Sequence, residues 1–145
     1  MAAIDLNTVR KIIESRLKDE FRVGPSIPLI FNNVAFDDSS ADQYIQCITS
    51  FGASEYLTQE APNSSTTSTN LIVGLCLFNI FTKQGIGSGS NFAICKRLRD
   101  LFNRITVSDV RFDAPEGPSI LQSDLEGRFQ TQISITFEIY EALTP

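Results

Sequence analysis

Three glycines, Gly85, Gly87 and Gly89, alternate with other residues in the stretch KQGIGSGSNF, between an apolar run and a segment with helical spacing. A glycine-rich turn from a strand into a helix can hold a phosphate group, because the N–H groups of the first helical turn point at the anion. The dinucleotide fingerprint needs a third glycine where Ser90 stands, and the Gly-Lys-Ser/Thr sequence of a Walker A loop is absent. We therefore interpret these glycines as a structural turn, in which Ser88 or Ser90 caps the next helix. A phosphate or nucleotide site is the alternative.

Three carboxylates, Asp37, Asp38 and Asp42, lie close together in the stretch FDDSSAD and invite a calcium or magnesium interpretation. An EF-hand loop requires alternating oxygen ligands, a central glycine and a terminal glutamate, and this stretch lacks that pattern. We interpret it as a solvated turn and predict no metal site.

The sequence contains no histidine, so Ser-His-Asp and Cys-His catalysis and histidine-based zinc sites are excluded within it. Cys47, Cys76 and Cys95 are widely spaced and lie among apolar neighbours. We expect them to be small buried side chains in a reducing compartment rather than reactive thiols. No set of residues indicates catalysis, so we predict no catalytic residue, no cofactor and no enzymatic activity.

The size and charge of the chain restrict its class. With 145 residues, 42% hydrophobic and 20% charged, it fits a single globular domain over residues 1–145. The net charge of −5 argues against a free-standing nucleic-acid binder, which needs Lys and Arg facing phosphate. The N-terminus lacks a secretory apolar region, and the longest apolar run, residues 71–81, is too short to span a membrane. We expect a soluble protein.

The spacing of apolar residues predicts two amphipathic helices, which position the candidate residues described above. The first is capped by Asp5 or Asn7 and ends before Gly24 and Pro25; its apolar positions are Leu6, Val9, Ile12, Ile13 and Leu17. The second begins at Ser90 and runs to about Arg104, with apolar positions Ile94, Cys95, Leu98, Leu101, Phe102 and Ile105.

Several strands accompany the helices. We predict a short apolar stretch at 29–36, a strand at 43–57 with a bulge at Gly52, a strand at 71–82 covered on both faces, and one short strand within 107–115. Residues 116–127 form a loop that can contain a short strand. The last strand alternates strictly, with Thr131, Ile133, Ile135, Phe137 and Ile139 on one face. These elements predict an α+β fold, a mostly antiparallel β-sheet with two amphipathic helices packed on one face.

Three surfaces are candidates for contacts with a neighbouring subunit or partner. The polar loop at 58–70 has little to bury, and such loops often become ordered when a partner binds. The basic side of the second helix could meet an acidic surface, and the polar face of the last strand is free for solvent or for a neighbour. The candidate residues are Ser64, Ser65, Thr66 and Thr67 in the loop, Lys96, Arg97 and Arg99 on the helix, and Gln130, Gln132 and Glu138 on the strand.

Together, five segments of the chain carry a resemblance to a known family. They are IDLNTVRKIIESRL, IPLIFNNVAFDD, YIQCITSF, the long stretch LIVGLCLFNIFTKQGIGSGSNFAICKRLRDLF, and GRFQTQISITFEIYE. Their hydrophobicity and spacing, over essentially the whole chain, resemble the tail terminator proteins of long-tailed bacteriophages, which are minor tail proteins that end the tail tube.

The resemblance implies a structural role in the virion. It implies a ring, usually a hexamer, that is assembled in the host cytoplasm and sits on the head-proximal end of the tail tube. Such a ring stops tube polymerisation and contacts the tail tube protein, the head-tail connector and, in contractile tails, the sheath. DNA would pass through its lumen without specific binding. Another connector or tail-completion protein is an alternative, as is a small cytoplasmic phosphate-binding or nucleotide-binding domain that uses the Gly85–Gly89 loop.

Overall fold

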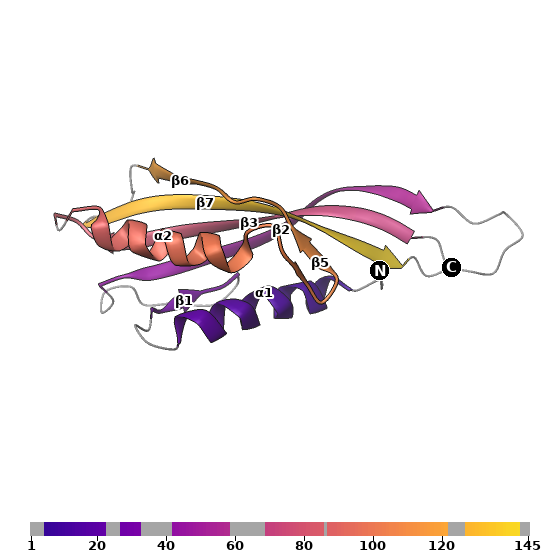
Figure 1. The fold of residues 1–145 in the computed structure, drawn as a ribbon, viewed down its shortest axis with the longest axis horizontal. Coiled ribbons are helices and arrows are strands. Elements are labelled where there is room, and N and C mark those ends of the chain that lie inside the picture. Colours follow the sequence, from indigo (N-terminus) through magenta and orange to yellow (C-terminus); the bar gives the residue numbers. More distant parts are fainter. Residues whose placement is uncertain are drawn as a thin grey trace, which may run out of the picture.

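The computed structural model describes residues 5–22, 27–32, 42–58, 69–85, 87–121 and 127–142. Its elements follow one another along the chain as shown in Figure 1. They are α1 (Leu6–Phe21), β1 (Leu29–Ile30), β2 (Tyr44–Thr58), β3 (Thr69–Lys83), α2 (Gly89–Phe102), β4 (Thr106–Val107), β5 (Val110–Phe112), β6 (Glu116–Leu121) and β7 (Arg128–Ala142). None of the described helices is both long enough and apolar enough to cross a membrane.

The strands form one sheet in the order β1-β2-β3-β7-β5-β4, and β6 also pairs with β7. Among the strands that the structure describes, β1 and β2 pair in parallel and all the other pairs are antiparallel. Both helices lie on the same side of the sheet, and β2, β3 and β7 continue past them at one end of the molecule (Figure 1). The predicted α+β architecture is therefore confirmed.

Helix α1 begins and ends where the sequence predicts. Asp5 is its N-cap, and the Asp5 carboxylate accepts a hydrogen bond of 2.7 Å from the backbone N–H of Thr8. This bond stabilises the ionised form and lowers the pKa of Asp5. One face of the helix is fully buried at every third or fourth position, Val9, Ile13, Leu17 and Phe21. The helix ends at Phe21, before the Gly24-Pro25 pair.

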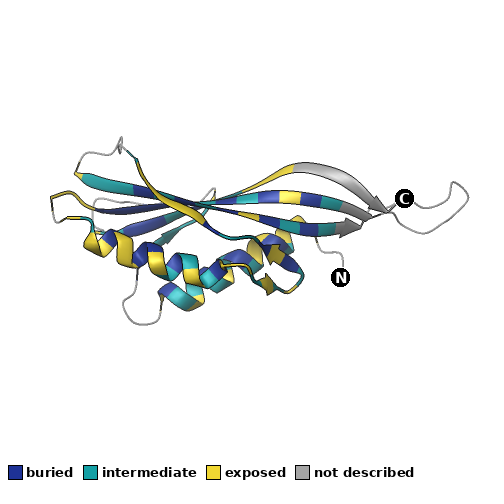
Figure 2. Ribbon diagram, turned by 45° about the horizontal axis from the view of Figure 1, so that its top comes forward, coloured by how far each residue is buried: buried dark blue, intermediate teal, exposed yellow. Residues whose placement is uncertain are grey.

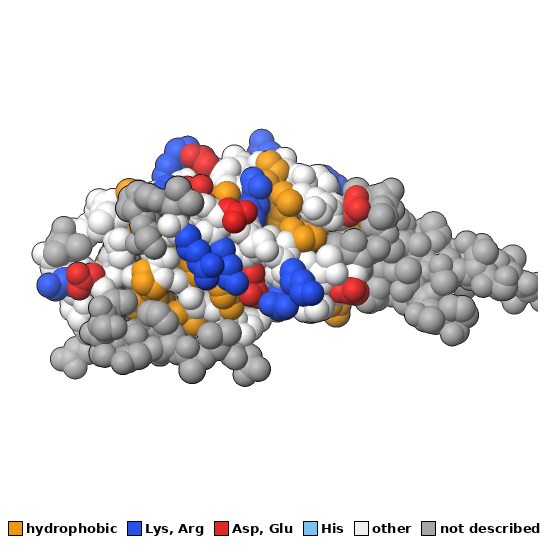
Figure 3. All heavy atoms as spheres, turned by 90° about the horizontal axis from the view of Figure 1, so that it is seen from below, with side chains coloured by type: hydrophobic (Ala, Val, Ile, Leu, Met, Phe, Trp, Pro, Cys, Tyr) orange, Lys and Arg blue, Asp and Glu red, His pale blue; other side chains and the backbone are white. Residues whose placement is uncertain are grey.

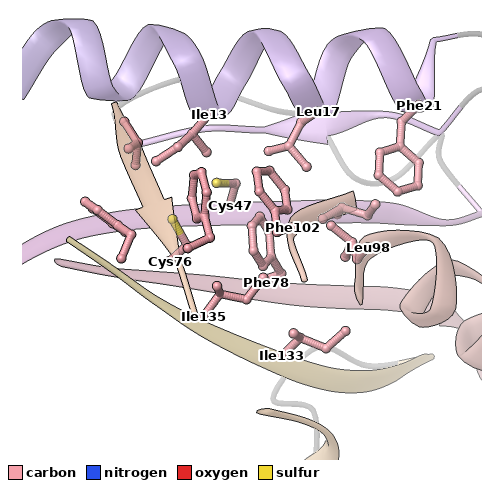
Figure 4. Packing of buried hydrophobic residues seen from close by; sticks show 14 of the residues in the cluster. Ile13, Leu17, Phe21, Cys47, Cys76, Phe78, Leu98, Phe102, Ile133 and Ile135 are labelled. Carbon is pink, nitrogen blue, oxygen red and sulfur yellow. The ribbon is translucent and has the colours of Figure 1, made fainter. Parts of the chain in front are cut away.

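The core lies between the helices and one face of the sheet. Strand β7 alternates as predicted, because Thr131, Ile133, Ile135, Phe137 and Ile139 are all at most 1% exposed. Figure 2 shows this alternation of buried and partly exposed positions along the strands. In Figure 4 the apolar side chains of α1 point at those of the sheet, and the Phe78 and Phe102 rings stack at 5.6 Å. This helix-facing surface is called the inner sheet face below.

Two arginines join the helices in a reciprocal way. Arg16 of α1 donates to the Leu101 carbonyl at the end of α2 over 2.8 Å, and Arg97 of α2 donates to the Glu20 carbonyl at the end of α1 over 2.9 Å. Each guanidinium also lies over the final phenylalanine ring of the opposite helix, at 5.9 and 4.4 Å. The last carbonyls of both helices gain donors, and the two helices are held antiparallel.

Strand β3 is buried on both faces over only part of its length, so one prediction was partly wrong. All residues from Phe78 to Thr82 are buried, whereas from Leu71 to Leu77 burial alternates and Val73 is 38% exposed. The helices cover the inner sheet face alone. The apolar run at 71–82 predicted a strand buried on both faces, but its outer face is partly exposed to solvent between Leu71 and Leu77.

A hairpin replaces the single short strand predicted at 107–115. Strands β4 and β5 pair through Val107 and Val110, and the turn between them places Ser108 at φ 46° and Asp109 at φ 71°. Two consecutive residues with positive φ are typical of a type I′ turn, which usually contains Asn or Gly. Because the sequence has Ser and Asp at these two positions, it did not indicate a type I′ turn.

Two other predictions about the strands are confirmed. The short strand allowed within 116–127 is β6. The predicted bulge near Gly52 is confirmed by the register shift between Phe51 and Ser54.

Candidate functional site

The glycine turn that joins β3 to α2 has the predicted backbone but not the predicted cap. Gly85 and Gly87 have φ values of +90° and +85°, where side-chain-bearing residues are strained, and Gly89 is the first residue of α2. Ser88 occupies the N-cap position, but its side chain makes no capping hydrogen bond. A Cβ atom at any of the three glycines would meet no atom within 4 Å. Backbone conformation, and not close approach to a neighbour, therefore explains Gly85 and Gly87.

A buried asparagine, Asn91, anchors the first turn of α2 to the sheet. Its amide nitrogen donates to the carbonyls of Ile80 and Phe129 and to the Thr82 hydroxyl, over 3.1, 3.5 and 3.3 Å. Its amide oxygen accepts from the Thr131 hydroxyl and from the Cys95 thiol. Asn91 is 0% exposed, and the network satisfies both its nitrogen and its oxygen. Asn91 was not among the residues predicted from the sequence, although it precedes Ile94 and Cys95 by one helical turn and so lies on their face.

We expect Asn91→Asp to destabilise the fold by about 3 kcal/mol. The change replaces a buried donor with a carboxylate oxygen that faces two carbonyl oxygens and a hydroxyl. Urea unfolding followed by circular dichroism measures the loss. The matched control is Asn103→Asp at the exposed end of α2, which should change stability by less than about 0.5 kcal/mol. Equal stability of the two variants would contradict the anchoring role of Asn91.

The three thiols are buried and free. Burial raises the pKa of Cys47 to about 12 and also raises the pKa values of Cys76 and Cys95. A thiol that stays protonated is a poor nucleophile and a poor metal ligand. Within the described ranges, no group of three or more His, Cys, Asp or Glu side chains is placed to hold a metal ion.

The basic side chains of α2 mostly form hydrogen bonds and ion pairs with other residues of the same chain. Arg97 is bonded to α1, as described above, and Arg99 donates to two backbone carbonyls at the start of β6, over 3.1 and 2.6 Å. Lys96 pairs with Asp100 over 2.8 Å, and its side chain is 74% exposed. Of the three candidates, Lys96 is thus the most available to another molecule.

The sheet face opposite the helices, here called the outer sheet face, carries an amide cluster. The Asn79 side-chain oxygen accepts from Gln130 and Gln132 over 3.1 and 3.0 Å, and its nitrogen donates to Gln46 over 3.1 Å. The network crosses β2, β3 and β7. Gln130 and Gln132 therefore belong to one polar patch, as their shared face predicted.

Beside the amide cluster the outer sheet face becomes apolar. Ile48, Leu71, Leu75 and Leu77 are half-buried and Val73 is 38% exposed. Glu138 is directly opposite Val73 and pairs with Arg111 over 3.3 Å. Partly exposed apolar residues in neighbouring register positions form a surface suited to contact with another protein.

The remaining candidates come from the polar loop and from the acidic turn. The loop residues Ser64, Ser65, Thr66 and Thr67 lie outside the described residues, as do Asp37 and Asp38 of the acidic turn. Asp42 is exposed, and its backbone carbonyl accepts a hydrogen bond of 2.9 Å from Arg128.

A cleft of about 320 Å³ lies between α1 and the β4–β5 hairpin, and the sequence did not indicate it. Ile12 and Val107, both half-buried, contribute apolar surface. The polar side chains that line it are Thr8, Lys11, Ser15, Arg16, Asp19 and Ser108. The cleft joins residues about 90 positions apart, so only the folded chain creates it.

Comparison with known proteins identifies the fold alone. No protein-family model matches the sequence, and no curated protein matches it significantly. Among 23 solved chains with significant structural similarity, one aligns over 98% of both chains with a TM-score of 0.64 and 17% identity. That protein carries no functional name. At this identity the match shows that the α+β fold occurs in another protein over its full length.

Proposed function

We propose that this protein is a tail terminator of a long-tailed bacteriophage, a structural virion protein of the tail neck. It forms a ring, expected to be a hexamer, on the head-proximal end of the tail tube. The ring ends tube polymerisation and contacts the tube protein and the head-tail connector, with a further contact to the sheath in a contractile tail. The proposal rests on the sequence resemblance and on the outer sheet face.

The observation that carries the proposal is an uncharged patch on the outer sheet face, which includes partly exposed apolar residues. Fourteen neighbouring positions on this face are uncharged: Tyr44, Gln46, Ile48, Ser50, Leu71, Val73, Leu75, Leu77, Asn79, Phe81, Gln130, Gln132, Ser134 and Thr136. The charged residues in register with the same face, Lys83, Arg111, Glu116, Arg128 and Glu138, lie beside them. Loss of charge together with exposed apolar area is typical of the central part of a protein–protein interface.

The net charge of the chain is consistent with a ring around DNA. A chain of charge −5 repels the phosphate backbone, so DNA can slide through a lumen without being held. A closed ring requires two different surfaces on each subunit, one for each neighbour. We assign the outer sheet face to one of these two contacts.

Size-exclusion chromatography with light scattering tests the ring, and Val73→Lys tests the surface. We expect the unmodified protein to have a mass near six subunits and Val73→Lys to be mainly monomeric, because a charge desolvated in an interface costs several kcal/mol. The new lysine lies directly opposite Glu138, so the subunit should still fold. Circular dichroism checks that it does.

The matched control is Leu6→Lys on α1, because Leu6 is also 38% exposed and the charge change is the same. A ring that survives Leu6→Lys and not Val73→Lys supports the assignment of the outer sheet face to a ring contact.

Two results would favour the alternative functions. A strictly monomeric unmodified protein that gains thermal stability with ATP or NAD would favour the glycine turn as a nucleotide site. Capping of tail-tube polymers in vitro supports a terminator, and binding to filled heads alone would indicate another connector protein.

A further inference from the structure

The cleft between α1 and the β4–β5 hairpin is lined by charged groups that form no ion pair with another described residue. Within the described residues, neither Lys11 nor Asp19 forms an ion pair. Arg16 donates through Nε to the Leu101 carbonyl, and its two terminal nitrogens form no hydrogen bond with another residue that the structure describes. The cleft therefore presents two cations and one anion beside the apolar surface of Ile12 and Val107.

The wall of the cleft opposite α1 is a strained turn. Ser108, which lines the cleft, has φ 46°, and its neighbour Asp109 has φ 71°. A left-handed conformation costs a residue with a side chain about 1 kcal/mol or more, and it persists only where the surrounding structure enforces it. Here the hairpin pairing of Val107 with Val110, a fully buried residue, enforces it. The Ser108 hydroxyl is thus held at the cleft by a rigid element.

Charge is unevenly divided between the helices and the rest of the chain. Helices α1 and α2 contain seven Lys or Arg and four Asp or Glu residues, a net charge of +3. The whole chain has −5, so the remaining residues carry −8. Figure 3 looks onto the α1 side, where several Lys and Arg side chains lie near the middle with acidic residues between them. Because the helices are net positive and the rest of the sequence is net negative, an acidic segment of a second copy is attracted to the helix side.

The geometry points to the α1–hairpin cleft as the seat of a carboxylate-bearing segment from a second copy of this chain. Lys11 and the free nitrogens of Arg16 bind the carboxylate, the hydroxyls of Ser15 and Ser108 complete its hydrogen bonds, and an apolar side chain of the same segment packs on Ile12. Asp19 disfavours a multiply charged phosphate and accepts a donor from the segment, which favours a protein ligand. This inference rests on the proposed self-association.

Sedimentation velocity on Lys11→Glu tests the inference. Lys11 is exposed, so the variant should fold normally, and it should weaken self-association at least about tenfold, because it places two carboxylates in one site. The matched control, Arg104→Glu, makes the same charge change at an exposed residue that does not line the cleft, and it should leave association within about twofold. High salt should weaken association of the unmodified protein and reduce its difference from Lys11→Glu.

A second pair of variants tests the cleft without changing charge. Ser15→Trp fills the cleft from an exposed position and should also weaken association at least about tenfold, whereas Ser15→Ala should not. A ring that tolerates both Lys11→Glu and Ser15→Trp while Val73→Lys disrupts it would overturn this inference and leave the ring intact as a proposal. An unmodified protein that is monomeric at every concentration would overturn both.

Discussion

Replacing Ile135 with aspartate should unfold the protein. Ile135 is 1% exposed on the inner sheet face of the central strand β7, between Ile133 and Phe137, and no described cation contacts it. Burying an unpaired carboxylate there costs more than about 4 kcal/mol, which is a large part of the roughly 5–15 kcal/mol that stabilises a typical domain. We expect loss of the cooperative thermal transition in circular dichroism.

The neighbouring residue provides the control for this prediction. Ser134 is half-buried on the outer sheet face, opposite Glu116, and a like-charge pair there costs only up to about 1 kcal/mol, so Ser134→Asp should leave the subunit folded. The two variants also distinguish folding from assembly, since Ser134→Asp adds a charge to the uncharged patch of the outer face and is expected to disrupt only the ring. If Ile135→Asp folded and Ser134→Asp did not, the two faces of β7 would be reversed.

Gly74→Ala should lower the free energy of unfolding by about 3 kcal/mol. A Cβ atom at Gly74 would lie 2.1 Å from the tip of the Phe137 ring, which is fully buried. That ring also contacts Phe112 and Phe51, at centroid distances of 6.0 and 5.8 Å, so it cannot move without disturbing them. Overpacking of a core usually costs about 1–3 kcal/mol, and this overlap involves an aromatic ring. Urea denaturation measures the effect.

Two further variants show whether the Phe137 ring is the cause. In the double variant Gly74→Ala with Phe137→Leu, the second change should cost less than it does alone, because the smaller side chain leaves room for the methyl group. Gly89→Ala is the backbone control, since a Cβ there meets no atom and the residue begins a helix. Additive effects at positions 74 and 137 would show that the two residues do not compete for space.

Much of the fold could be predicted because its signals are local. The Asp5 cap, the spacing of Val9, Ile13 and Leu17, and the strict alternation from Thr131 to Ile139 each lie within one element. A period of 3.6 or of 2 determines which side chains share a face, whatever the element later packs against. The faces of α1 and β7 were therefore predicted correctly.

The errors arose where the answer depended on a distant segment. An apolar run such as 71–82 does not indicate how many faces are covered, because the number of layers depends on where the helices pack. The Ser108–Asp109 turn carries no standard turn residue, and pairing of the flanking strands enforces its conformation. The candidate arginines Arg97 and Arg99 looked like a solvated face, yet both bind carbonyls of other elements.

The sequence by itself determined the element types, the core face of each helix and of the last strand, and the lack of histidine chemistry within the chain, because these follow from residue type and local period. Only the tertiary structure decided that Asn91 anchors α2, that Arg16 and Arg97 join the helices, that an uncharged patch on the outer sheet face spans three strands, and that a cleft opens beside α1. Each of these features unites residues from separate elements. Their distances are set by packing and register, which no local pattern specifies.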